Sequence, residues 1–151
     1  MSKWDLAYLD VVHRFSQLST AVRLKVGAIV VKSDRIISIG YNGMPSGWDN
    51  SCEYYLPSSI ESWMHPEDHS VYGELVTKEE VIHAEANCIA KLAKGNEGGE
   101  GSVMYSTHAP CLDCAKQIYG AGIIKVIYSN EYRSTSGIEF LENCGIGVEQ
   151  A

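Results

Sequence analysis

Two short motifs carry residue types that bind metals and move protons. The first, HAEAN, begins at His83, and the second, PCLDC, contains Cys111 and Cys114. A CxxC segment at the start of a helix puts both sulfurs on one face, about one turn apart, and the helix N-terminus lowers the pKa of the thiols. One imidazole and two thiolates suit zinc, and three protein ligands leave a fourth position open for water. The spacing therefore predicts a zinc site of the catalytic kind.

Glu85 lies two residues after the histidine of this predicted site. Two thiolates cancel the formal charge of Zn²⁺, so such a zinc should acidify water less than a zinc held by three histidines, for which the pKa of the water is about 7. A carboxylate beside the water can take its proton and deliver it to a substrate nitrogen. We expect Glu85 to shuttle protons and not to bind the metal.

Both motifs also have simpler uses. A lone CxxC in a cytosolic protein can be a redox pair, and a lone histidine at a helix start is usually structural. A redox CxxC, however, normally opens the helix after the first strand of its unit and has no need of a His-x-Glu motif. The two motifs together favour the metal site.

Composition limits the class of protein. With 151 residues, 45% hydrophobic and 21% charged, the chain predicts one soluble domain spanning residues 1–151. A net charge of −7 argues against a polymeric nucleic acid as partner, although one or two local basic groups can still hold a small anion.

The sequence shows no signal peptide and no stretch long enough to span a membrane, which predicts a cytoplasmic protein. Five cysteines, an odd number, favour metal ligands or free thiols over disulfides.

Hydrophobic periodicity and turn residues divide the chain into alternating helices and strands. After an initial helix and a strand hairpin, the order implies a three-layered α/β domain with a mixed sheet. The predicted helices are about residues 3–19, 78–94, 111–122 and 137–145, and the predicted strands are residues 26–31, 35–41, 102–107 and 125–130. About residues 48–77 lack periodicity and predict a long aromatic loop, of a kind that is usually functional or packs as a lid.

HAEAN and PCLDCAK resemble the catalytic motifs of the cytidine deaminase superfamily, whose signature is H-x-E followed by P-C-x-x-C. GYNGMPSG, at residues 40–47, resembles the glycine loop of its deoxycytidylate (dCMP) deaminase subgroup, and the similarity runs over about residues 24–127. The resemblance implies a three-layer α/β/α domain with a central mixed five-stranded sheet. It also implies hydrolysis of dCMP to dUMP and ammonia, with water attacking C4 of cytosine. His83, Cys111 and Cys114 would bind zinc, and Glu85 would donate and accept the proton.

Further residues are candidates for substrate binding. Backbone atoms at Ala84, Thr107, His108, Ala109 and Pro110 would grip the base edge, as the superfamily implies. Asn42 is either a hydrogen-bond partner of the sugar hydroxyl or a turn residue in left-handed geometry. Arg23 and Lys25 either neutralise the 5′-phosphate or form a solvated surface pair. Tyr132 resembles a family tyrosine near the nucleotide, but an ordinary packed tyrosine fits as well.

The resemblance also implies regulation. Many similar enzymes are homo-hexamers, activated by dCTP and inhibited by dTTP, and Mg²⁺ would accompany the dNTP effector. The region assigned to the effector comprises Gly40, Tyr41, Asn42, Gly43, Met44, Pro45 and Gly47.

Other cysteines and histidines fit this scheme less clearly. Cys52, His65 and His69 match part of a second, structural zinc site of some phage members, but Thr20 and Ala21 stand where a further cysteine is expected, so the ligand set looks incomplete. Cys88 and Cys144 are expected to be small buried hydrophobic residues.

Two other functions stay open. One is a deaminase of another substrate, such as a free base, a nucleoside or tRNA, although a polymer would need a basic groove and a free base would not need Arg23 or Lys25. The other is a non-catalytic, dNTP-binding zinc module, in which Glu85 would have no purpose.

Overall fold

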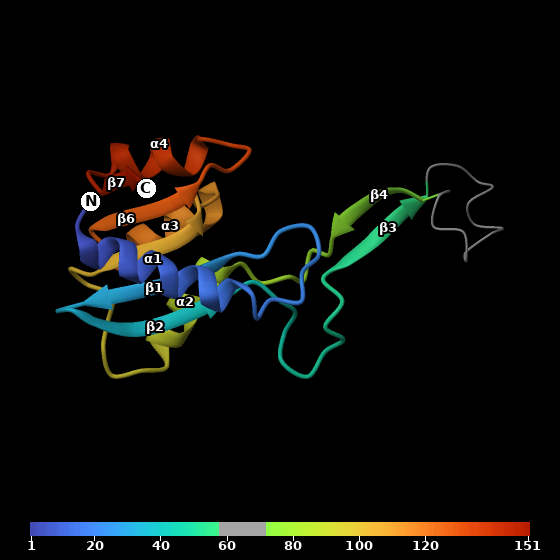
Figure 1. Ribbon diagram of the computed structural model, residues 1–151, viewed down its shortest axis with the longest axis horizontal. Coiled ribbons are helices and arrows are strands. Elements are labelled where there is room, and N and C mark those ends of the chain that lie inside the picture. The colour runs from blue at the N-terminus through green and yellow to red at the C-terminus, as the bar shows by residue number, and fades with distance from the viewer. Residues whose placement is uncertain (58–71) are drawn as a thin grey trace.

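The computed structural model describes residues 1–57 and 72–151 of the chain. In these described residues, four helices pack around a five-stranded sheet, and a two-stranded hairpin extends away from them (Figure 1). In chain order the elements are α1 Lys3–Ser16, β1 Gly27–Lys32, β2 Arg35–Tyr41, β3 Glu53–Pro57, β4 Tyr72–Thr77, α2 Ala84–Ala93, β5 Val103–His108, α3 Leu112–Gly120, β6 Lys125–Asn130, α4 Ser136–Asn143 and β7 Gly147–Gln150.

The large sheet is mixed, in the order β2-β1-β5-β6-β7. β1 is antiparallel to both β2 and β5, whereas β5, β6 and β7 are parallel. This confirms the predicted mixed five-stranded sheet, and β7 is the strand that periodicity did not reveal because it has only four residues. Parallel pairing brings the carboxyl ends of β5 and β6 together, with His108 beside Asn130.

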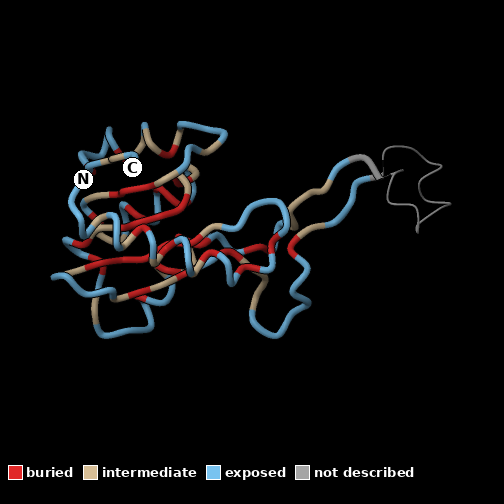
Figure 2. The backbone as a smooth tube through the Cα atoms, viewed as in Figure 1, coloured by how far each residue is buried: buried red, intermediate tan, exposed pale blue. Residues whose placement is uncertain are grey.

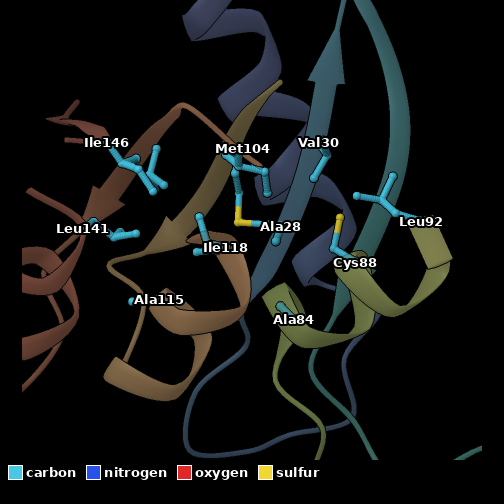
Figure 3. Packing of buried hydrophobic residues seen from close by; sticks show 12 residues of the cluster. Ala28, Val30, Ala84, Cys88, Leu92, Met104, Ala115, Ile118, Leu141 and Ile146 are labelled. Atoms are coloured by element: carbon cyan, nitrogen blue, oxygen red, sulfur yellow. The ribbon is translucent and has the colours of Figure 1, made fainter. Parts of the chain in front are cut away.

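The two faces of β1 supply two cores, which makes the domain three-layered as predicted. Ala28 and Val30 point into a cluster with α2 and α3, which Figure 3 shows together with Met104 and Ile118. Ile29 and Val31, which alternate with Ala28 and Val30 along the strand, pack in a second cluster with α1. Strand side chains alternate between faces, so this one strand separates the helical layers.

Polar contacts fix the start of the first helix. The Ser2 hydroxyl accepts the Asp5 amide and the Asp5 carboxylate accepts the Ser2 amide, which forms a capping box. Asp5 also accepts a 2.7 Å hydrogen bond from the hydroxyl of Tyr105 in β5, which ties α1 to the sheet. The helix ends at Ser16, three residues before the predicted end, and the chain then turns toward β1.

The predicted first hairpin is confirmed. Ser33 and Asp34 form its two-residue turn with φ angles of 50° and 58°. Positive φ at both central positions is typical of a type I′ turn, whose twist matches that of the flanking strands. β2 begins at Arg35 as predicted.

The predicted long loop at about residues 48–77 is wrong in part. β3 and β4 pair antiparallel, with Glu53 opposite Thr77, and form the exposed hairpin in Figures 1 and 2. The sequence shows no apolar–polar alternation here because neither face of β3 is buried at positions 54–56, where three exposed residues follow one another. The roles proposed for His65 and His69 lie outside the described residues.

Two local expectations are corrected. The second predicted helix begins at Ala84 and not near residue 78, because Ile82 forms two backbone hydrogen bonds with Gly43, 3.1 and 2.9 Å long, and the chain remains extended there. Cys144 is exposed at the end of α4, whereas Cys88 is fully buried as expected. Within the described ranges, no helix has the length and apolar character to cross a bilayer.

Candidate metal centre and substrate pocket

Three side chains from two helix starts converge on one point. The Nδ1 atom of His83 lies 3.5 Å from Sγ of Cys111 and 3.4 Å from Sγ of Cys114, and all three atoms lie within 4.8 Å of one another. Zinc bonds of about 2.3 Å to sulfur and about 2.0 Å to nitrogen, in tetrahedral geometry, put such atoms about 3.5 Å apart. The spacing of these donors therefore fits a zinc ion with three protein ligands.

The backbone places these ligands at equivalent positions of two helices. His83 is the residue that precedes α2, Cys111 precedes α3, and Cys114 lies in the first turn of α3. Gly137 of α4 packs against the Pro110 and Cys111 backbone, where a Cβ atom would collide with both. Only a glycine permits this close approach, so α4 supports the start of α3.

Proton sharing among the ligands prepares them for a cation. Hydrogen bonds with Cys114 and then His83 lower the pKa of Cys111 to about 3, so its sulfur is a thiolate at neutral pH. The same contact raises the pKa of Cys114, so the Cys114 thiol keeps its proton and donates a hydrogen bond to the Cys111 sulfur. The hydrogen bond to Cys111 raises the pKa of His83. A zinc ion would replace these shared protons and bind both sulfurs as thiolates.

Glu85 is 4% exposed in the first turn of α2. Burial raises the pKa of its carboxyl group, while its own backbone amide opposes this by hydrogen bonding to the charged form. A carboxyl group with a raised pKa takes up a proton more readily than an exposed glutamate does, which suits the first step of a proton shuttle.

A pocket opens above these groups, and we call it the inner pocket. It brings together Ala84, His108, Ala109 and Tyr132, which the sequence singled out, with two of the three metal-site residues, His83 and Cys111. Thr107 and Pro110 are buried behind its wall and do not line it. The full lining is Leu24, Val26, Asn42, Glu53, Thr77, Val81, His83, Ala84, Glu85, His108, Ala109, Cys111 and Tyr132.

A second pocket adjoins it and is called the outer pocket. The two share Leu24, Thr77, His83, His108 and Tyr132. The outer pocket adds two guanidinium groups and two carboxylates to its wall. These are Arg23, Arg133, Glu74 and Glu131.

The two cations that the sequence suggested for phosphate binding lie in different places in the structure. Arg23 lies in the outer pocket, whereas Lys25 lines neither pocket. Arg133, which the sequence reasoning missed, stacks its guanidinium group over the Tyr132 ring at 5.5 Å. Its position next to Tyr132 in the sequence is the signal that could have identified Arg133 as a candidate.

Asn42 is 9% exposed and supports the pocket wall. Its side-chain oxygen accepts the Val26 amide at 2.9 Å, and its side-chain nitrogen donates to the Leu24 carbonyl at 2.8 Å. The left-handed turn alternative is wrong, since Ser33 and Asp34 are the non-glycine residues with positive φ in the described ranges. The side-chain amide has a second lone pair and a second hydrogen, which are available for a hydrogen bond to a ligand.

The segment at residues 40–47 lines a third hollow, here called the loop pocket, together with Asn87 and Lys91 of α2. Asn42 lines both the loop pocket and the inner pocket. Gly40 does not line the loop pocket and is instead buried against α2. Of the predicted effector residues, those in the wall are Tyr41, Asn42, Gly43, Met44, Pro45 and Gly47.

Cys52 is fully buried beside Thr20 and Ala21. The Thr20 hydroxyl lies 3.5 Å from its sulfur. In the described ranges, the cluster with metal-binding geometry is the one at His83.

Sequence reasoning missed Glu53 and Thr77, which face each other across β3 and β4 at the base of the hairpin. Both line the inner pocket. The Glu53 carboxylate accepts the amides of Val22 and Arg23, at 2.9 and 3.1 Å, and so orients the chain that leads to the outer pocket. No local motif marks either residue.

Residues 2–130 match the family described as "Cytidine and deoxycytidylate deaminase zinc-binding region". The chain is 35% identical to the deoxycytidylate deaminase of enterobacteria phage T4, over 93% of this chain and 86% of that protein. It is 32% identical to ComE operon protein 2 of Bacillus subtilis, over 97% of this chain and 70% of that protein.

Among solved structures, the dCMP deaminase of cyanophage S-TIM5 in complex with dCMP and dUMP superimposes with a TM-score of 0.84 at 40% identity. The match covers 100% of this chain and 99% of the other.

Proposed function

Because this chain belongs to the cytidine and deoxycytidylate deaminase family, we propose that it is a zinc-dependent dCMP deaminase, which converts dCMP and water to dUMP and ammonia. The convergence of His83, Cys111 and Cys114 beside the buried Glu85 carries this proposal. The relatives from phage T4 and cyanophage S-TIM5, which are named for the same reaction, support the choice of substrate. Residues 1–151 act as one deaminase domain. Five free thiols fit a reducing compartment, so we place the enzyme in the cytoplasm.

Glu85 performs the proton transfers. When bound, zinc would lower the pKa of a water molecule and so make it easier for a nearby base to deprotonate. Glu85 accepts a proton from the attacking water and donates it to N3 of the cytosine ring. It then transfers the second proton to the leaving amino group, which departs as ammonia. Its burial suits this role because burial raises the pKa of the carboxyl group, so Glu85 takes a proton from water more readily than an exposed glutamate would.

Each pocket binds a different part of the substrate. The inner pocket holds the base, with backbone groups at Ala84, His108 and Ala109 available to its polar edge, while Thr107 and Pro110 support the wall from behind. Arg23 and Arg133 of the outer pocket neutralise the 5′-phosphate. Asn42 and Tyr132 flank the sugar, and Lys25 contributes at most long-range charge.

Ammonia release from a panel of substrates tests the proposal. The zinc-loaded protein should deaminate dCMP with a higher kcat/KM than deoxycytidine, cytosine, guanine or a tRNA anticodon stem-loop. A preference for cytosine or guanine would contradict the assignment of the outer pocket, and deamination of the stem-loop would contradict the small-nucleotide assignment. Binding of zinc without turnover of any substrate would favour a non-catalytic module.

We further propose that dCTP with Mg²⁺ activates the enzyme, that dTTP inhibits it, and that the active form is a homo-hexamer. The loop pocket supports this, because it contains the cation Lys91 and shares Asn42 with the inner pocket. Gel filtration and initial rates with and without each dNTP test it. A monomer with hyperbolic kinetics that neither dNTP changes would contradict the regulation.

A further inference from the structure

His108 closes β5 at the place where the inner and outer pockets meet. Its ring is half-buried, and its Nδ1 atom lies 3.0 Å from the hydroxyl oxygen of Thr107. No residue in the ranges 1–57 and 72–151 forms a hydrogen bond with its Nε2 atom. One nitrogen of the ring is thus held by the protein, and the other is left for a ligand.

Thr107 determines which nitrogen of His108 carries the hydrogen. A hydroxyl group has one hydrogen and two lone pairs, and one lone pair of the Thr107 hydroxyl accepts the Gly27 amide at 3.1 Å. Thr107 is 1% exposed, and within the described chain the acceptor for its hydroxyl hydrogen is Nδ1 of His108. A hydrogen on Nδ1 would leave the buried hydroxyl hydrogen without an acceptor, which is unfavourable. Nδ1 therefore accepts, and Nε2 carries the single hydrogen of a neutral ring.

The position of this donor indicates the part of the ligand that it meets. His108 shares the inner pocket with Glu85 and the outer pocket with Arg23 and Arg133. A nucleotide whose base lies beside Glu85 passes His108 on the way to the two guanidinium groups. An anionic oxygen there accepts stronger hydrogen bonds than a neutral one.

We propose that the Nε2–H group of His108 donates a hydrogen bond to an oxygen of the substrate 5′-phosphate, and that Thr107 is the positioning residue that fixes this donor. The inference rests on the proposed function and adds to it a neutral group that selects the nucleotide over the nucleoside.

Steady-state kinetics with dCMP and deoxycytidine test the role of His108. In zinc-loaded His108→Leu, kcat/KM for dCMP should fall about tenfold or more through KM, since a hydrogen bond to a charged group is lost. The value for deoxycytidine, which lacks the phosphate, should stay within about twofold. His108→Gln, which keeps an N–H donor near the Nε2 position, should recover part of the loss. Inhibition by dUMP against deoxyuridine gives the same comparison without turnover.

Variants of two adjacent hydroxyl residues test the role of Thr107. Thr107→Val should raise KM for dCMP more than KM for deoxycytidine, and Thr107→Ser, which keeps the hydroxyl group, should restore the discrimination between the two substrates. Ser106→Ala is the matched control, because the buried Ser106 hydroxyl donates to the backbone carbonyl of His108 at 2.7 Å and not to its ring. It should lower Tm and leave the ratio of the two substrates unchanged. In the His108→Leu background, Thr107→Val should change this ratio no further.

The outcomes separate this inference from the proposed function. Equal losses on dCMP and deoxycytidine, or no loss on either, would overturn the role of His108 while the deaminase assignment stands. A wild-type protein that releases ammonia from neither substrate would contradict the deaminase assignment itself. Zinc content and Tm of each variant show whether the fold is intact.

Discussion

Gly40 of the edge strand β2 lies directly against the backbone of Ala84, the residue between His83 and Glu85. A Cβ atom at Gly40 would collide with the Ala84 carbonyl oxygen and would lie 2.7 Å from the Cys88 backbone nitrogen. The close approach of strand and helix therefore sets the position of the first turn of α2, and with it one metal ligand and the proton shuttle.

Gly40→Ala should displace α2 and weaken the metal site. The forced contact is with backbone and cannot be relieved by a side-chain movement, so the expected loss in free energy of unfolding is about 1–3 kcal/mol, the usual cost of overpacking. Zinc affinity should fall in parallel. Urea unfolding and competition with a chelating dye measure the two effects. Gly43→Ala is the control, because a Cβ at Gly43 meets nothing within 4 Å, and equal behaviour of both variants would contradict this packing role.

The reactivity of the thiols should report zinc binding. Cys144 is exposed, whereas Cys52 and Cys88 are fully buried, and burial raises the pKa of Cys88 to about 11. A thiol reagent at neutral pH should therefore modify one cysteine quickly in the zinc-loaded protein. After chelation, Cys111 becomes a free thiolate because its pKa is about 3, and a second cysteine should react quickly.

Mass spectrometry of the labelled protein identifies the modified positions. Cys144→Ser should remove the first reactive thiol and leave the second, and Cys111→Ser should do the reverse in the chelated protein. An unchanged labelling pattern after chelation would show that the cysteines of the site do not hold the metal.

The hydrogen bond between Tyr105 and Asp5 should make stability depend on pH. Donation from the Tyr105 hydroxyl is the largest cause that lowers the pKa of Asp5, so the folded state favours the carboxylate. This stabilisation is present above the ordinary pKa of Asp5, 3.8, and is lost as pH falls through the lowered value. Tyr105→Phe should lower the free energy of unfolding by about 1 kcal/mol at pH 7 and by less below about pH 4.

Urea unfolding with a chelator in every sample measures this difference without a contribution from metal loss. Tyr8→Phe is the matched control, since the Tyr8 ring packs on Tyr105 at 5.0 Å and its hydroxyl has no hydrogen-bond partner in the described ranges. A Tyr105→Phe effect that is equal at both pH values would exclude the carboxylate as its origin.

The sequence predicted the parts of the molecule that local rules determine. Cys111 and Cys114 sit at a helix start, so the CxxC spacing already indicated that both sulfurs share one face, and the H-x-E and P-C-x-x-C signature added His83 to them. The β1–β2 hairpin and β6 followed from turn residues and apolar runs.

The remaining features depend on contacts between distant segments. The start of α2 was placed too early because pairing of Ile82 with Gly43 overrides helix propensity. Glu53 and Thr77 reach the inner pocket only because β3 pairs with β4, for which no alternating pattern exists. The side-chain bonds of Asn42 to the residues before β1 likewise leave no trace in local sequence.

The most direct test is the rate of ammonia and dUMP release from dCMP by wild-type protein and by Glu85→Gln, each carrying measured zinc. Glutamine keeps the shape of the buried side chain but cannot exchange a proton, so we predict equal zinc content, a similar Tm and a kcat lower by about two to four orders of magnitude. A Glu85→Gln variant that binds zinc and deaminates dCMP at the wild-type rate would contradict the role of Glu85 as the proton shuttle.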